Sequence, residues 1–75
     1  MTVVDIKIDT DIIQLDQFFK WAGVVGSGGE VKELLAEKRI TLNGKIETAR
    51  RRKLHTGDVV KIADVGAWRV VSKAE

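Results

Sequence analysis

The sequence predicts an α+β domain in which two packed helices lie against a small, mostly antiparallel sheet of about four or five strands. Three observations predict it: apolar residues recur at helical spacing from Leu15, a serine and a glutamate mark a second helix start at Ser27, and Asn43-Gly44 joins two short strand-like segments. The 75 residues predict one domain, residues 1–75. A domain of this size buries only about 60% of the surface of its unfolded chain, which leaves little room for a deep catalytic cleft.

The first segment, Val3 to Ile8, is predicted to be a strand because Val4, Ile6 and Ile8 share one face at a period of two. No partner strand lies next to it in the sequence. We therefore expect it to close the sheet against the last predicted strand, Trp68 to Val71. Residues 9–13 are expected to turn the chain into the first helix.

The first helix is predicted from an apolar stripe at i, i+3, i+4 and i+7 that starts at Leu15 and includes Phe18, Phe19 and Ala22. Gly23 is well suited to end this helix, because glycine adopts the left-handed conformation that side chains resist.

The second helix is predicted to run from about Gly28 to about Lys38, because Ser27 and Glu30 match the capping-box pattern S-x-x-E. A short connector between two amphipathic helices implies that they pack together. Val31, Leu34 and Leu35 are expected to face the first helix, and Lys32 and Glu33 are expected to face solvent.

A tight hairpin is the strongest local prediction, because Asn43-Gly44 supplies the two positive-φ residues of a type I′ turn between residues 40–42 and 45–47. Residues 48–55 show no clear period, although Leu54 is expected to return to the core. A turn at residues 56–58, a strand at residues 59–62 and a second turn at residues 64–66 complete the predicted order.

Charge is unevenly distributed along the chain, although the net charge is only +2. Residues 1–19 contain four aspartates and one lysine, whereas residues 20–61 contain ten basic and five acidic residues. The helix, the hairpin and the basic run Arg50-Arg51-Arg52-Lys53 follow one another within that positive part. A basic face on a small domain indicates nucleic acid as the first partner class and an anionic membrane surface as the second.

The spacing of several short motifs resembles a known family. The matching segments are Leu15-Asp16-Gln17-Phe18, Ser27, Val31-Lys32-Glu33-Leu34-Leu35, Ile40-Thr41-Leu42-Asn43-Gly44-Lys45 and Gly57-Asp58-Val59-Val60. They resemble the RNA-binding domain named after ribosomal small-subunit protein four, also called the alpha-L motif, over about residues 14–62. The whole chain is similar to the small stand-alone bacterial proteins called YaaA and YbcJ.

The resemblance implies an RNA-binding protein that docks on structured RNA, with ribosomal RNA as the expected target and ribosome assembly or translation as the expected process. It implies contacts from both helices and the basic loop. Carried over by position, the expected RNA-binding residues are Ser27, Gly28, Lys32, Lys38, Arg39, Lys45, Arg50, Arg51, Arg52 and Lys53.

The same residues also have structural interpretations. The arginine run suits phosphate oxygens, since guanidinium groups bind them through two parallel hydrogen bonds, but it could also be a solvated loop. Lys38 and Arg39 suit the negative end of a helix dipole. Ser27 can serve as an N-cap with or without a phosphate on the adjacent amides. Trp21 either offers a stacking platform for an unpaired base or covers the rim of the core, and Trp68 is expected in the core.

No catalytic or cofactor chemistry is predicted. The chain has no cysteine and a single histidine, His55, and no nucleophile is paired with a base. We therefore expect neither an enzyme nor a bound metal or cofactor. No apolar run approaches the ~18 residues of a membrane span, and the N-terminus lacks a signal-peptide pattern, so we expect a cytoplasmic protein. We also expect it to be a monomer.

Two alternatives remain open from the sequence. One is a protein adaptor that binds its partner through the acidic N-terminal strand, residues 2–11, whose sheet edge is a template for pairing. The other is a binder of duplex DNA, which the charge alone permits.

Overall fold

The main element of the structure is a five-stranded sheet with the order β1-β7-β6-β3-β4. The computed structural model describes residues 2–72, so Met1 and residues 73–75 of the predicted domain lie outside the described part. The strands of this sheet are β1 (Val3–Lys7), β3 (Ile40–Leu42), β4 (Lys45–Ile46), β6 (Val59–Ile62) and β7 (Gly66–Val71).

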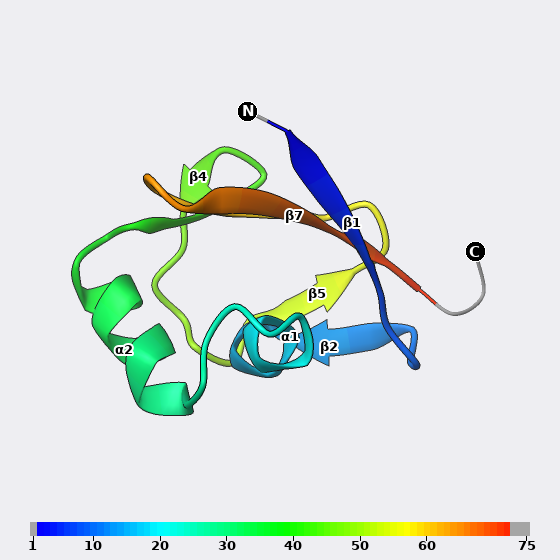
Figure 1. Cartoon of the computed structure of the whole chain (residues 1–75), viewed down its shortest axis with the longest axis horizontal. Coiled ribbons are helices and arrows are strands. Elements are labelled where there is room, and N and C mark those ends of the chain that lie inside the picture. The colour runs from blue at the N-terminus through cyan, green and yellow to red at the C-terminus, as the bar shows by residue number, and fades with distance from the viewer. Residues whose placement is uncertain (1, 73–75) are drawn as a thin grey trace.

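The two ends of the chain meet in this sheet, as predicted. β1 pairs with β7 in parallel, with Val3 opposite Ala67 and Lys7 opposite Val71. The other neighbouring pairs in the sheet are antiparallel. β1 therefore forms one edge of the sheet and β4 the other, and Figure 1 shows β1 crossing in front of β7.

A second, two-stranded sheet was not predicted. It pairs β2 (Ile12–Gln14) with β5 (Lys53–His55) in antiparallel register, with Ile13 opposite Leu54. Each strand has only three residues, too few for a period of two to be visible in the sequence. The prediction that residues 9–13 are only a turn was therefore wrong for Ile12 and Ile13, which belong to β2. The predicted return of Leu54 to the core is confirmed, because Leu54 is 0% exposed.

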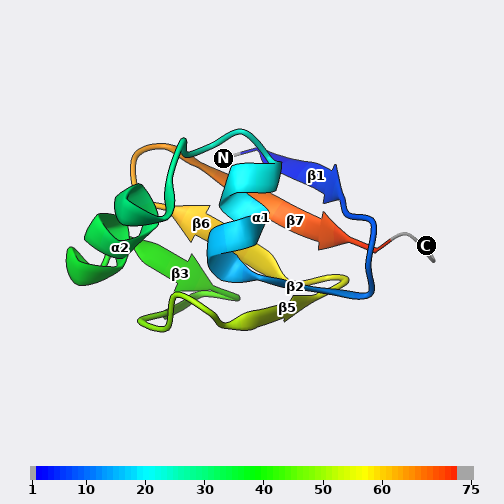
Figure 2. The same ribbon diagram turned by 90° about the horizontal axis from the view of Figure 1, so that it is seen from below.

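Helices α1 (Leu15–Trp21) and α2 (Gly28–Ala36) lie on one side of the five-stranded sheet, as Figures 1 and 2 show. α1 ends as predicted, since Gly23 has a φ of 74°. The N–H of Val24 donates to the carbonyl of Phe19 (2.9 Å), and that of Gly23 donates to Lys20 (3.1 Å). These two bonds form a Schellman motif.

α2 starts at Gly28 as predicted, but the predicted capping box and the predicted end of the helix require correction. Ser27 is the N-cap residue, but its side chain makes no capping hydrogen bond, and Glu30 Oε1 instead accepts from the N–H of Gly26 (3.3 Å). The helix also ends at Ala36 rather than near Lys38, because Lys38 itself adopts a φ of 57°, outside the helical region.

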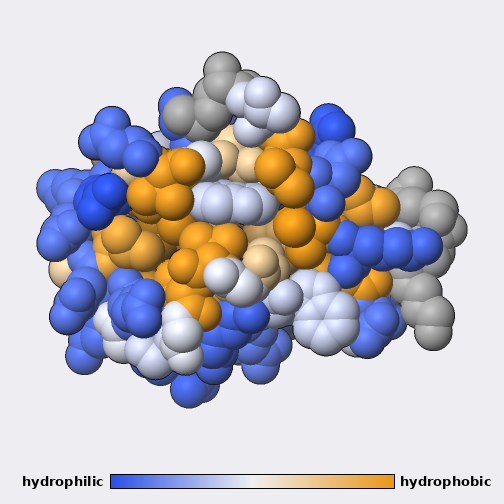
Figure 3. All heavy atoms as spheres, viewed as in Figure 1, coloured by the Kyte–Doolittle hydropathy of each residue, from blue (hydrophilic) through white to orange (hydrophobic). Residues whose placement is uncertain are grey.

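The core fills the space between the five-stranded sheet and the helices. Leu15, Phe18 and Phe19 from α1 are fully buried there. The same cluster includes or contacts apolar residues from α2, from the hairpin and from the later strands: Val31, Leu35, Ile40, Leu42, Leu54, Val60, Ile62 and Val70. Figure 3 shows apolar atoms that reach the surface along this layer, with hydrophilic groups around them.

The two tryptophans differ in burial. Trp68 is half-buried, and its ring meets that of Phe19 edge-on at 5.8 Å, so it is part of the core as predicted. Trp21 is 53% exposed, and its Nε1–H donates to the carbonyl of Lys7 (2.9 Å). This bond ties the end of α1 to the end of β1 and leaves much of the ring accessible.

Within residues 2–72, neither helix has the length and hydrophobicity that crossing a membrane requires.

Candidate nucleic-acid interface

The three arginines of the basic run lie in a loop that is fixed to the start of α1, and Lys53 begins β5. The loop connects β4 to β5, and its carbonyl groups accept hydrogen bonds from the first amides of the helix. The N–H of Leu15 donates to Arg52 (2.9 Å), and that of Asp16 donates to Arg50 (3.1 Å). Within the loop, the N–H of Arg52 donates to the carbonyl of Ala49 (3.2 Å). The arginines are therefore presented by an ordered backbone, although no periodicity in the sequence indicates it.

Two of the three arginines face a carboxylate. The guanidinium Nε of Arg50 lies 3.9 Å from Asp16 Oδ2, and that of Arg52 lies 3.6 Å from Glu47 Oε1. Arg51 and Lys53 are exposed, and neither takes part in an ion pair within residues 2–72. Because the side chains of Arg50 and Arg52 remain 42% and 57% exposed, all four cations remain available to an external anion.

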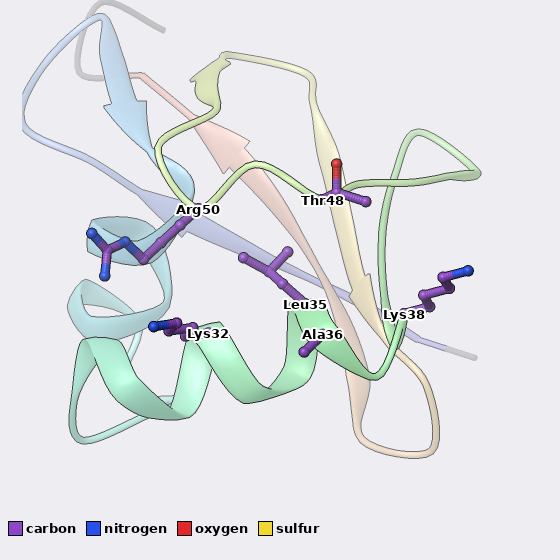
Figure 4. A pocket seen from close by; sticks show the side chains of 6 residues that line it. All are labelled: Lys32, Leu35, Ala36, Lys38, Thr48 and Arg50. Carbon is purple, nitrogen blue, oxygen red and sulfur yellow. The ribbon is translucent and has the colours of Figure 1, made fainter.

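A groove separates α2 from this loop, and it contains three of the predicted RNA-binding residues. It has a volume of about 510 Å³ and is lined by Lys32, Leu35, Ala36, Lys38, Thr48 and Arg50. In Figure 4, Lys32 and Arg50 extend in the same direction at one end, Lys38 lies at the other end, and Leu35 lies between them. Cations 18 positions apart in the sequence thus line one open channel, which suits the phosphates of a polynucleotide backbone.

A second hollow continues the basic surface beyond Lys38. It has a volume of about 340 Å³, and its lining includes Lys38, Arg39 and Lys61. The Arg39 side chain is held in place, because Nη2 donates to the carbonyl of Ala63 (2.8 Å) and Nη1 lies 3.7 Å from Glu37 Oε1. Lys38 lines both hollows and therefore connects them.

Lys61 is a residue that the sequence interpretation missed. It lies on β6 between the buried residues Val60 and Ile62, so its side chain faces the opposite side of the sheet from the core. The alternation in Val59-Val60-Lys61-Ile62 was the available signal. Its proximity to Lys38 and Arg39 depends on strand pairing, with Thr41 opposite Lys61, which the sequence alone does not reveal.

The remaining predicted residues lie around these two hollows. Lys45 on β4 and Arg52 line a third hollow, of about 470 Å³, at the hairpin. Ser27 and Gly28 begin α2, at the opposite end of the helix from Lys38. Lys32, Lys38 and Arg50 therefore line one groove. Arg39 lines the neighbouring hollow, which also includes Lys38, and Lys45 lines the third hollow together with Arg52.

Lys38 combines a surface role with backbone strain. It occupies the position after the α2 cap where glycine is preferred, with Lys38 N–H donating to Leu35 (3.0 Å) and Arg39 N–H donating to Leu34 (3.0 Å). We expect Lys38→Gly to stabilise the fold by up to about 1 kcal/mol in chemical unfolding, because it relieves left-handed strain.

Lys38→Ala is the matched control, because it removes the same charge but keeps the Cβ. It should not stabilise the fold, and both variants should weaken RNA binding to a similar extent. Equal unfolding free energies for the glycine and alanine variants would contradict the assignment of strain.

The fold and this surface together define a class of protein: a small α+β nucleic-acid-binding domain whose helix, hairpin and loop present cationic side chains along neighbouring hollows. Comparison with known proteins then gives the family. The S4 domain model matches residues 6–71, and the chain belongs to this family. The expected fold class and the expected class of function, an RNA-binding domain, are thereby confirmed.

A curated relative extends the comparison over most of the chain. The probable ribosome maturation protein RlbA of Bacillus subtilis (strain 168) is 45% identical over 67 residues, which cover 89% of this chain and 94% of the relative. The resemblance to small stand-alone bacterial S4 proteins is thus confirmed as well.

Proposed function

We propose that this chain docks as a monomer on structured ribosomal RNA through its basic surface, and that it assists ribosome maturation in the cytoplasm without catalysing a reaction. The observation that carries the proposal is the groove between α2 and the basic loop, which Lys32 and Arg50 line at one end and Lys38 lines at the other. Membership of the S4 family and the name of the Bacillus relative support the choice of RNA and of the process.

The proposed docking is electrostatic. Lys32, Lys38 and Arg50 would hold phosphates along the groove, and Arg51, Arg52 and Lys53 would extend the contact along the loop. Arg39 and Lys45 would bind on the hairpin side, and the amides that follow Ser27 and Gly28 would contact a phosphate at the start of α2. Because the deep groove of A-form RNA excludes side chains, shape should matter more than base sequence.

Competition between RNA and DNA tests the proposal. A labelled, folded ribosomal RNA fragment is titrated with the protein at several salt concentrations, and an equal length of duplex DNA serves as competitor. We expect a preference for RNA and a logarithmic salt slope of about −3 to −5, since four to six phosphates would each release about 0.7 to 0.9 counterions. Equal competition by DNA would overturn the choice of RNA and favour a duplex DNA binder.

One observation favours the adaptor as a second candidate. β1 is an edge strand, and its residues Val3 and Val4 are 38% and 48% exposed. An exposed edge with apolar side chains is a template for a partner's strand. The acidic residue on this strand, Asp5, is already held by Arg69 at 2.7 Å, which weakens the acidic character that the adaptor hypothesis requires. Partner capture that survives loss of the basic loop would favour this candidate.

A further inference from the structure

Two acidic side chains lie beneath the basic loop. The Glu47 and Asp16 side chains are 14% and 15% exposed, whereas those of their partners Arg52 and Arg50 are 57% and 42% exposed. A carboxylate within a surface that binds a polyanion should weaken that binding by simple repulsion. The positions of these two carboxylates indicate a different role.

Glu47 organises the loop through both of its carboxylate oxygens. Oε2 accepts hydrogen bonds from the N–H groups of Thr48 and Ala49, each at 3.0 Å, and Oε1 faces Arg52 Nε at 3.6 Å. The backbone of Glu47 is itself fixed to β3, because its N–H donates to the carbonyl of Ile40 (3.0 Å). The side chain therefore links the edge hairpin to the first turn of the basic loop and to one of its arginines.

Asp16 holds the other end of the same loop. Its N–H donates to the carbonyl of Arg50 (3.1 Å), its Oδ1 accepts from the N–H of Gln17 (2.9 Å), and its Oδ2 faces Arg50 Nε. In both ion pairs the arginine approaches the carboxylate through Nε. In Figure 4 the terminal amino groups of Arg50 point away from the loop, where a phosphate could reach them.

Four adjacent cations repel one another, so an unsupported loop would spread its arginines over many conformations. Binding would then carry the cost of ordering each side chain, about 0.5 to 1.5 kcal/mol for every side chain immobilised. A carboxylate held beneath the loop reduces that cost before RNA arrives. It also faces the side of the guanidinium that a phosphate does not need.

We propose that Glu47, together with Asp16, is a positioning residue for RNA docking: it preorganises the basic loop, and its negative charge strengthens the binding of a polyanion. This inference rests on the proposed function. It predicts that removing this negative charge weakens RNA binding, whereas simple repulsion predicts that the same change tightens it. A variant that removes one charge therefore tests the inference.

The test compares Glu47→Gln with Glu33→Gln by anisotropy on the same RNA, after circular dichroism has shown that both variants are folded. Glu33 is a matched control, because its exposed side chain on α2 takes part in no ion pair or hydrogen bond within residues 2–72. We expect Glu47→Gln to weaken binding about three- to tenfold, and Glu33→Gln to leave it unchanged or tighter. Tighter binding by both variants would overturn the inference.

A double-mutant cycle then asks whether the effect passes through Arg52. In an Arg52→Ala background, the loss caused by Glu47→Gln should shrink to less than about twofold, because the side chain that it positions is gone. A loss of the same size in both backgrounds would overturn the positioning role while leaving RNA docking intact. Absence of RNA binding by the wild type would instead overturn the proposed function, and the inference with it.

Discussion

Replacing Arg50, Arg51 and Arg52 together by alanine is expected to weaken RNA binding by roughly two orders of magnitude at physiological salt, because three charge-assisted phosphate contacts are removed. The logarithmic salt slope should become shallower by about 2 to 3, because fewer counterions are released. Anisotropy titrations of the wild type and the variant over the same salt series measure both quantities. The fold should persist, since the loop's backbone bonds to Leu15 and Asp16 do not use the arginine side chains.

A variant of equal charge separates local contact from general attraction. Lys7, Lys20 and Arg69 lie outside the three hollows described above, on β1, α1 and β7. Their joint replacement by alanine removes the same three charges and should weaken binding much less, because exposed charges farther than about 8 to 10 Å from the phosphates are largely screened. Equal losses in the two triple variants would contradict docking through the basic loop.

Much of the fold could be predicted because its signals are local. The alternation of Val4, Ile6 and Ile8, the stripe that begins at Leu15 and the Asn43-Gly44 turn each act within a few residues. Asn43 and Gly44 do adopt positive φ values of 52° and 87°. The pairing of β1 with β7 was also inferred, because the first strand had no neighbour with which to pair, but its parallel direction was not predicted.

The errors have physical causes of two kinds. β2 and β5 are defined by pairing between residues about 40 positions apart, and a segment of three residues is too short to show the alternation that predicts a strand. The end of α2 was misplaced because Lys38 takes the left-handed position that usually indicates glycine. In that case packing and hydrogen bonds at the helix end outweigh a local preference worth about 1 kcal/mol.

The predicted site residues were chosen one at a time by charge and motif position, and their grouping could not be predicted. Lys32 and Arg50 line the same groove because the loop is attached to α1 while α2 packs on the same core. Lys61 was missed because only the register of β6 against β3 brings it to Arg39. Glu47 resembled an ordinary hairpin residue in the sequence, and its contacts with the loop became visible only in three dimensions.

The core that holds these elements together is small, so we expect Phe19→Ala to cause the largest loss of stability. Phe19 is fully buried and contacts the rings of Phe18 and Trp68 at 6.0 and 5.8 Å between centroids. Removing such a side chain costs about 3 to 5 kcal/mol. A domain of this size has a total stability of only about 4 to 11 kcal/mol. Thermal and urea unfolding should show a strongly destabilised protein, and RNA binding should fall with the folded fraction.

Trp21→Ala provides the comparison within the same helix. Trp21 is 53% exposed, and its main specific interaction is the hydrogen bond to Lys7, so the loss should be only about 1 kcal/mol. A stability loss as large as that of Phe19→Ala would contradict the placement of the core.

Because this variant stays folded, its RNA affinity also decides between the two interpretations of Trp21. A stacking platform would lose about 1 to 3 kcal/mol of binding energy, whereas a rim residue would lose almost none.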